Sequence, residues 1–471
     1  MSFWALYIKS TVYGPGLTVH FSILGGEDMS TQNKAAAGKG FGAKGIGIMI
    51  LTFISIMLMS NICYDSLNVT IPVFGSMGWN TAPLYLFSTV AAWISVIGAG
   101  IWGVLCGKKT CRFAWGLSLV VAAIGCVIWN FAPGLSSVPV YFIGLALANI
   151  GGMGFAYIAS LNVISNWFPH KKGMAMGWVT IGFPLSAVVA TPLCSALVGK
   201  LGLNGIYLMY AVLCAILAVI VFAYVRDYPE EKGAYPDNDR SFDKATAEAE
   251  LKAGLEYMKT SPWTAKKLLH TGTVWKMVIS LGIMELLSLG IMTNFMPRMM
   301  QIIGANGPVY NQGEVIPMLA IAGLAACVGS VLCGLLDSKV GPKKAIIITY
   351  IIAIISIVLN VVGGNVAVTN KALGTTLLYI SLPFLAILLG GAANYLVSLT
   401  NTIWGRYDFP AAYRLLKPLV AVVGAIGITL VGGIGQAGPG YGVAYMVLGI
   451  LSVIGTIIMC TVSDKQVGRD M

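Results

Sequence analysis

The chain has 471 residues, of which 57% are hydrophobic and only 10% are charged. A soluble domain carries roughly 25% charged residues, so this composition excludes one. The net charge of +11 does not indicate a nucleic-acid partner, because the basic residues are not clustered on one surface. Runs of about 20 apolar residues recur along the chain, each long enough to cross a bilayer as a helix, and the alternating segments of a membrane barrel are absent.

The first 45 residues are predicted to form a tail outside the bilayer. Residues 1–28 lack the order of basic, apolar and small residues that marks a signal peptide. Gly25-Gly26-Glu27 lies shortly before Met29, and its codons can read as a purine-rich ribosome-binding sequence. Two hypotheses therefore stay open: translation starts at Met29, or residues 1–28 are a disordered extension. The intact mass of the native protein distinguishes them.

Twelve apolar runs follow in two sets of six, separated by a charged connector. The connector carries nine acidic and eight basic residues, and within it residues 245–257 are predicted to form a surface helix. The expected domains are a tail over 1–45, a six-helix bundle over 46–225, the connector over 226–273, a second six-helix bundle over 274–462 and a tail over 463–471. The expected spans are 46–74, 81–106, 113–132, 138–165, 173–199, 204–224, 274–301, 313–336, 343–362, 374–403, 413–433 and 441–462.

Basic residues are distributed unevenly about these spans. Of the 29 lysines and arginines, only Lys200, Arg298 and Lys371 fall in loops that we expect outside the cell. The positive-inside rule then predicts a multi-pass protein of the cell (inner) membrane with both termini in the cytoplasm. The nine cysteines show no metal-ligand spacing, so we interpret them as small packing residues and expect no metal site.

The two sets of spans also repeat each other in sequence. The fourth span of the first half and its counterpart in the second half share two glycines, an asparagine and an isoleucine at one constant offset. These residues are Gly151, Gly152, Asn162 and Ile164 in the first half and Gly390, Gly391, Asn401 and Ile403 in the second.

Two loops, at residues 103–112 and 336–344, resemble the Gly-x-x-x-Asp-Arg-x-Gly-Arg-Lys signature of the major facilitator superfamily. The first loop has Gly107 where the signature has an acid, whereas the second keeps Asp337. The resemblance implies an all-α membrane protein of twelve transmembrane helices in two pseudo-symmetric six-helix bundles around a central cavity. The candidate gating residues in these loops are Lys108, Arg112, Asp337, Gly341, Lys343 and Lys344.

A second resemblance is narrower. Residues 151–177 contain a glycine cluster, then Trp167-Phe168-Pro169, then Lys171-Lys172-Gly173, and they are similar to the oxalate/formate antiporter and monocarboxylate transporter group. This similarity implies a small organic anion, moved with a proton or exchanged for another anion. The arginine of that group in span eight has no counterpart, because residues 313–336 contain neither Arg nor Lys. Its lysine in span eleven corresponds to Lys417, which we expect within two turns of the cytoplasmic end.

Two acidic residues fall well inside predicted spans, Asp65 in span one and Glu285 in span seven. An ionised group at the membrane centre costs about 3 kcal/mol, so each needs a compensating role. Asn61, Asp65 and Asn68 are spaced as one helical face, beside Tyr64. This face either lines a cavity or holds helices together. A desolvated acid in a cavity has raised proton affinity, which suits proton coupling.

The remaining candidates are uncharged, apart from Arg298 at the outer end of span seven. Asn and Ser side chains can bind a substrate, but they also join helices in lipid. Arg298 is either the first contact of an incoming anion or an interface residue with its head in water. The uncharged candidates are Asn149 and Tyr157 in span four, and Asn394, Ser398 and Asn401 in span ten.

The sequence therefore predicts a secondary transporter that works by alternating access, with a small organic anion as the first choice of substrate. Efflux of an apolar or cationic compound is the alternative that the two acids favour. A non-transporting sensor is the rival from another class, although the connector is short for an output domain. We expect no catalytic constellation and no cofactor. The expected partners are a small-molecule substrate, the lipid bilayer and protons as coupling ion, and we expect a monomer.

Overall fold

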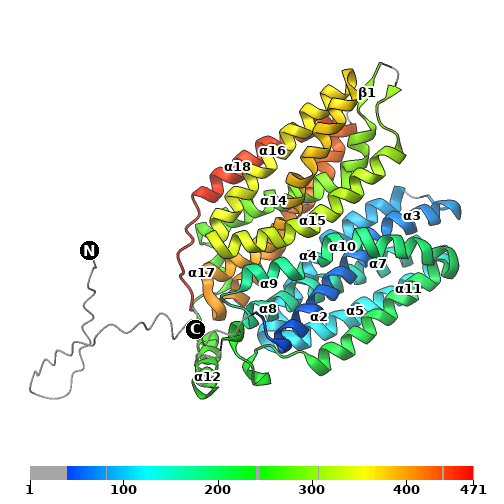
Figure 1. The fold of residues 1–471 in the computed structure, drawn as a ribbon. Helices are drawn as coiled ribbons and strands as arrows, with labels where there is room; N and C mark the ends of the chain where they lie inside the picture. The colour runs from blue at the N-terminus through cyan, green and yellow to red at the C-terminus, as the bar shows by residue number, and fades with distance from the viewer. Residues whose placement is uncertain (1–39, 81, 240–243, 306, 437–439, 470–471) are drawn as a thin grey trace, which may run out of the picture.

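The computed structural model describes residues 40–80, 82–239, 244–305, 307–436 and 440–469. Its helices lie in two bundles side by side, one from the chain before the connector and one from the chain after it (Figure 1). Within these described ranges, twelve helices are long and apolar enough to cross a membrane. The predicted all-α fold of twelve spans in two bundles is confirmed. The hypothesis of a start at Met29 concerns residues outside the described ranges.

Apolar runs with few charged residues build the first bundle, because a helix satisfies every backbone polar group within its own segment. Three of these helices contain one π-helical turn, labelled η. In chain order the elements are α2 (Ala43–Ser60), η1 (Asn61–Asp65), α3 (Leu67–Ser76), α4 (Ala82–Lys108), α5 (Cys111–Asn130), α6 (Ala132–Leu135), α7 (Val138–Gly152), η2 (Met153–Ile158), α8 (Ala159–Trp167), α9 (Lys172–Val179), α10 (Gly182–Leu185), η3 (Ser186–Ala190) and α11 (Thr191–Tyr224).

The connector forms two short 3₁₀ turns and two helices before the second bundle begins. The surface helix predicted over 245–257 is confirmed, since these residues lie within α12. In chain order the elements are η4 (Glu230–Lys232), η5 (Pro236–Asn238), α12 (Lys244–Thr260), α13 (Ala265–Leu269), α14 (Gly272–Met300), β1 (Ile303–Gly304), β2 (Gly307–Pro308), α15 (Gln312–Val340), α16 (Pro342–Thr369), α17 (Lys371–Gln436) and α18 (Gly440–Cys460). The strands β1 and β2 pair antiparallel.

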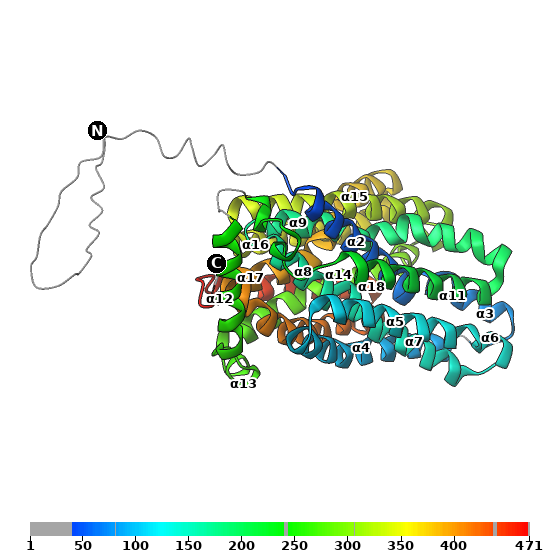
Figure 2. The ribbon, with the colours of Figure 1, turned by 90° about the horizontal axis from the view of Figure 1, so that it is seen from below.

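The two ends of the molecule differ. At one end α12 and α13 lie across the ends of the spanning helices, close to the C-terminus (Figure 2). We call this the connector end, and we call the opposite end, which carries β1 and β2, the hairpin end. In Figure 1 the bundles lie close together toward the connector end and diverge toward the hairpin end.

Glycines allow the two bundles to touch near the connector end. A Cβ on Gly177 of α9 would lie 2.9 Å from the carbonyl oxygen of Ser330 and 3.0 Å from the Cα of Gly334, both in α15. The Ser330 hydroxyl donates to the Gly177 carbonyl at 2.9 Å and lies 2.7 Å from the Thr180 hydroxyl. Close backbone approach and small hydroxyl residues are the means by which helices associate in lipid.

Two long helices change direction at a glycine instead of ending in a loop. Gly202 in α11 has φ 66° and ψ 179°, and Gly405 in α17 has φ 68° and ψ −178°. The sequence predicts a gap between spans ten and eleven over residues 404–412. The structure instead continues α17 directly past Gly405, so the eleventh span begins at Arg406 rather than near residue 413. This difference moves Lys417 deeper into the bundle than the sequence predicts.

Gly405→Ala tests this turn. The conformation at Gly405 is essentially restricted to glycine, so a side chain there costs about 1–3 kcal/mol. We expect a clear fall in the Tm of the purified protein in detergent. The matched control is Gly100→Ala, because Gly100 is exposed on α4 with no atom within 4 Å of the added Cβ. Equal Tm values for the two variants would contradict a strained turn at Gly405.

Candidate functional site

The centre of the candidate site is an ion pair between two spanning helices of the second bundle. The Lys417 ammonium of α17 lies 3.0 Å from Oε1 and 3.2 Å from Oε2 of Glu285 in α14. The side chain of Lys417 is 7% exposed and that of Glu285 is 20% exposed. Gly424, two helical turns beyond Lys417, makes room for the acid, since a Cβ there would lie 2.8 Å from Cγ of Glu285.

The depth of Lys417 corrects the sequence prediction. The sequence predicts this residue within two turns of the end of its span, but the helical segment begins at Arg406. Eleven residues separate Arg406 from Lys417, which places the lysine about 16 Å along the helix. Glu285 lies near the middle of α14, between Gly272 and Met300. A lysine therefore accompanies Glu285 inside the second bundle.

The first bundle contributes an aromatic face to this pair. The Lys417 ammonium lies 4.6 Å from the centroid of the Tyr157 ring, at a distance typical of cation–π attraction. The pair thus lies where the two bundles meet. A buried ammonium with one acidic partner and a tyrosine ring beside it can bind a small anion if the acid is neutralised.

Two of the three π-helical turns of the first bundle carry candidate residues. Tyr64 and Asp65 lie in η1, and Tyr157 lies in η2. A π turn inserts a residue into the helix and is often found at functional sites. Hydrophobic periodicity gives no signal for a single π turn, so the sequence could not predict these features.

The π turn η1 lies within the polar face predicted on the first span. The Asn61 side chain accepts a hydrogen bond from the Tyr210 hydroxyl at 2.6 Å and is buried within the first bundle. Asp65 instead accepts a hydrogen bond from the Ser60 hydroxyl at 2.9 Å. The two side chains thus bond to different elements of the first bundle, and the shared face stays a prediction. The side chain of Asn68 lies outside the described part of the structure.

The polar residues of span ten lie at the contact between the bundles. Asn394 donates to the Ser330 carbonyl oxygen at 3.1 Å and also bonds to the Thr180 hydroxyl of the first bundle. Asn401 donates to the Ser165 hydroxyl of α8 at 2.6 Å. Ser398 between them is fully buried. Asn149 in span four donates to the Leu145 carbonyl of its own helix at 2.9 Å.

Arg298 lies inside the second bundle rather than at its water interface. Its side chain is 5% exposed, and it donates from Nε to Oδ1 of Asn360 at 3.3 Å. The interpretation as a head group in water is therefore wrong, whereas the first contact of an incoming anion stays a prediction. The reason is packing: Gly364 on α16 leaves the space that the guanidinium occupies.

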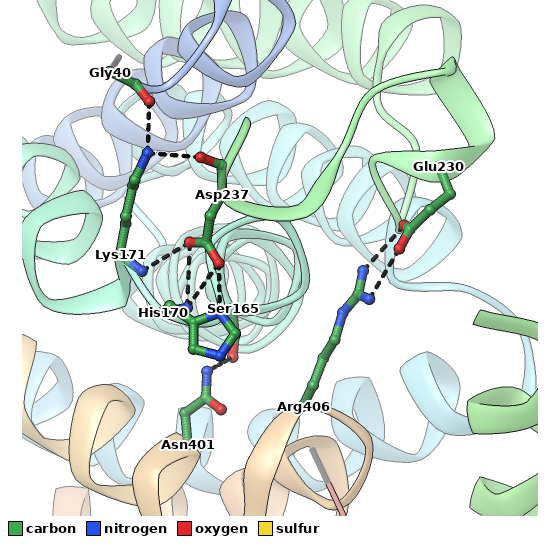
Figure 3. A network of polar contacts seen from close by, with 8 residues as sticks. All are labelled: Gly40, Ser165, His170, Lys171, Glu230, Asp237, Asn401 and Arg406. Carbon is green, nitrogen blue, oxygen red and sulfur yellow. Dashed lines mark hydrogen bonds and ion pairs between the residues drawn. The ribbon is translucent and has the colours of Figure 1, made fainter. Parts of the chain in front are cut away.

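Buried acids hold the connector against both bundles (Figure 3). Glu230 forms a bidentate ion pair with Arg406 at 2.9 and 3.0 Å, and both side chains are at most 3% exposed. Asp237 accepts hydrogen bonds from the backbone amides of His170 and Lys171, at the corner between α8 and α9. The connector is thus attached to the first bundle through Asp237 and to the second through Glu230.

A similar carboxylate contact lies at the start of α5. Asp227 accepts hydrogen bonds from the backbone amides of Cys111 and Arg112 at 2.5 and 2.7 Å. Negative charge at a helix N-terminus is stabilising. Burial raises the pKa of the Asp227 carboxyl, although these two hydrogen bonds oppose the rise.

Among the candidate gating residues, Asp337 lies against the opposite bundle. A Cβ on Gly173, in the first turn of α9, would lie 2.5 Å from Oδ2 of Asp337, so only glycine leaves room for this carboxylate. The remaining candidates lie on the loops themselves. Lys108 and Lys344 are exposed, Arg112 and Lys343 are half-buried, and Gly341 has a φ of 82° between α15 and α16.

A membrane fold of two six-helix bundles with a polar site between them is that of a transporter. The chain belongs to the major facilitator superfamily, whose family model matches residues 48–408. In the described part of the chain, no group of three or more His, Cys, Asp and Glu residues could hold a metal ion.

Two relatives are similar to parts of the chain. The oxalate:formate antiporter of Oxalobacter formigenes is 25% identical over 189 residues, which are 40% of this chain and 43% of the relative. A protein of Thermoproteus tenax named as an uncharacterized 38 kDa protein in the 23S RNA operon is 30% identical over 137 residues, which are 28% of this chain and 36% of the relative. The chain thus matches less than half the length of either relative.

Solved transporters share the fold over nearly the whole chain. The proton:xylose symporter XylE bound to 6-bromo-6-deoxy-D-glucose superposes with a TM-score of 0.65 and 16% identity, covering 92% of this chain and 98% of XylE. The E. coli fucose:proton symporter FucP superposes with a TM-score of 0.63 and 13% identity, covering 90% and 100%. At these identities the comparison shows the fold alone.

Glu230→Gln tests the buried ion pair at the connector end. Loss of one partner of a buried pair costs about 3–5 kcal/mol, so the contact between the bundles should open more often. We expect faster amide hydrogen exchange over residues 160–172 and 400–410, measured by mass spectrometry.

The matched control is Glu231→Gln, which removes a neighbouring acid that is exposed. Partial desolvation of the carboxyl group, together with the nearby charge of Asp227, raises the pKa of Glu231 to about 6, so at pH 7.5 this control also removes a negative charge. Unchanged exchange in Glu230→Gln, or the same increase in both variants, would contradict a specific closing role for Glu230.

Proposed function

We propose that the protein is a secondary transporter of a small organic anion, that Lys417 binds the anion, and that Glu285 binds the coupled proton. The observation that carries this proposal is the buried Lys417–Glu285 pair at the meeting point of the two bundles. No other lysine or arginine among the described residues is paired with an acid in the middle of a span.

Charge balance links the two ligands. While Glu285 is ionised it neutralises Lys417, and an incoming carboxylate gains little. Once Glu285 takes up a proton, the ammonium is left unpaired in a poorly hydrated place, which costs about 3–5 kcal/mol unless an anion replaces the acid. Proton and monocarboxylate therefore bind together and cross as a neutral pair. Exchange of one anion for another is possible at the same lysine without net proton movement.

Alternating access follows from the contacts at the connector end. In the described conformation Glu230 bonds to Arg406, and Asn401 bonds to Ser165, so this end is closed. We propose that the connector end and both termini face the cytoplasm, as the distribution of Lys and Arg predicts. The described state then has its closed side inward, and substrate release requires these contacts to separate.

The similarity to an oxalate:formate antiporter supports an organic anion, and Lys417 supplies the positive charge that an anion requires. Efflux of an apolar or cationic compound remains the second candidate, because Asp65 is an acid on the opposite bundle. We also propose that the transporter acts as a monomer.

Uptake into proteoliposomes separates these candidates. Radiolabelled formate, oxalate, lactate and a lipophilic cation would each be offered with and without an inward proton gradient. We expect one or more of the anions to accumulate, and a proton gradient to increase the accumulation. Transport of the cation alone would contradict the anion proposal.

Lys417→Gln and Glu285→Gln should fail in different ways. Loss of the ammonium removes a charge-assisted contact of about 1.5–3 kcal/mol, so anion affinity should fall about 10–150-fold. Glu285→Gln leaves Lys417 permanently available, so anion exchange should persist while the proton gradient no longer increases uptake. The measurement is uptake and counterflow in proteoliposomes.

The exposed pair Lys371–Glu314 offers a matched control. Glu314→Gln makes the same chemical change on an ion pair at the hairpin end, and glutamine can keep the hydrogen bond to the Asn311 amide. This variant should transport normally. If Glu285→Gln kept its proton dependence, Glu285 would not be the coupling residue.

Asp65→Asn distinguishes the two acids of the spans. We expect this variant to keep proton-driven anion uptake within about 3-fold of the unmodified protein, since Asp65 bonds to Ser60 rather than to Lys417. Abolished proton coupling in Asp65→Asn, with normal coupling in Glu285→Gln, would transfer the proton-binding role to Asp65.

A further inference from the structure

Arg298 is a second buried cation, and it lies in a different part of the second bundle. It occupies the last turn of α14, at the hairpin end, and Glu285 lies 13 residues earlier on the same helix. At 1.5 Å per residue, about 20 Å of helix separates the two side chains. Its contacts come from Asn360 on α16 and Tyr445 on α18, which lie on the side of this bundle away from the first bundle (Figure 1).

Unlike Lys417, Arg298 has no acidic partner among the described residues. Its protein contacts are the side-chain and backbone oxygens of Asn360, at 3.3 and 3.4 Å, and the Tyr445 ring, whose centroid lies 5.5 Å from the guanidinium carbon. A guanidinium is always charged, and a side chain only 5% exposed has little water to stabilise that charge. The described protein groups around the guanidinium therefore supply no negative charge.

Two further polar atoms at this place also lack partners. The amide nitrogen of Asn360 and the hydroxyl of Tyr445 are buried and make no hydrogen bond to any described residue. The residues themselves are 2% and 1% exposed. The Asn360 oxygen bonds to Arg298, so its amide nitrogen is free to donate elsewhere. All three groups can donate hydrogen bonds, and buried donors without acceptors are rare in proteins.

We propose that Arg298, Asn360 and Tyr445 form a binding site for a small monovalent inorganic anion of the size of chloride. The donor set lacks a negative charge, and an anion supplies both that charge and the missing acceptor. Because Arg298 is almost completely enclosed, a large carboxylate or a lipid head group does not fit as well as a single ion. A Cβ added to Gly364 would overlap the guanidinium, so the glycine leaves room for the Arg298 side chain beside this site.

This anion differs from the transported one. It binds within one bundle, between α14, α16 and α18, and it balances the permanent charge of Arg298. The transported anion instead balances the charge of Lys417 after Glu285 has taken up a proton. Its role is to stabilise the hairpin end of the second bundle, and the site does not depend on the substrate proposed for Lys417.

The test is the thermal stability of the full-length purified protein in chloride against gluconate at constant ionic strength and pH. Binding to the folded state raises Tm in proportion to the logarithm of ligand concentration above Kd. We expect chloride to raise Tm by about 2 °C or more over gluconate, and bromide and nitrate to raise it as well. No difference between chloride and gluconate would overturn the proposal.

Three variants locate the effect. Tyr445→Phe removes a single hydroxyl and should weaken the chloride response, and Arg298→Gln should abolish it. Asn360→Asp places a carboxylate beside the guanidinium, so this variant should fold without chloride and lose its chloride response. Lys371→Gln, at an exposed site on the same end, is the control and should respond as the unmodified protein does. A full chloride response in Asn360→Asp and Tyr445→Phe would place the anion elsewhere and overturn the proposal.

Discussion

Lys417 and Glu285 face each other where the two bundles meet, and the helices around them exclude most of the water. Two opposite charges in such a place are tolerated only as a pair, because removing either one leaves the other unpaired in a medium of low dielectric. The residues around the pair accommodate both of its members. Gly424 leaves space for the carboxylate, and Tyr157 from the other bundle offers its ring to the ammonium.

The position of this pair connects binding with movement. Tyr157 belongs to the first bundle and the charged residues belong to the second, so a change in charge at the pair acts on the interface between them. Further along the same interface, Ser165 bonds to Asn401 and the connector bonds to Arg406. In the proposed cycle, proton and anion binding replaces the ion pair between Lys417 and Glu285 at the centre. The hydrogen bonds and the ion pair at the connector end then separate.

Much of the fold could be predicted from sequence, because a spanning helix needs about 20 apolar residues and the connector is marked by its charge. The site could be predicted only in part. Asp65 and Glu285 are recognisable because acids are rare in spans. The sequence places Lys417 too close to the end of its span, because the start of this helix depends on the backbone of Gly405. A contact between residues 132 positions apart, or one π turn, leaves no mark in a hydrophobic pattern.

The central claim is that anion binding to Lys417 requires a proton on Glu285. Calorimetric titration of the purified protein with the transported anion, in buffers of different ionisation enthalpy, measures the number of protons taken up per anion bound. Near pH 7.5 we predict uptake approaching one proton for the unmodified protein and none for Glu285→Gln. Anion binding without net proton uptake by the unmodified protein would contradict the account.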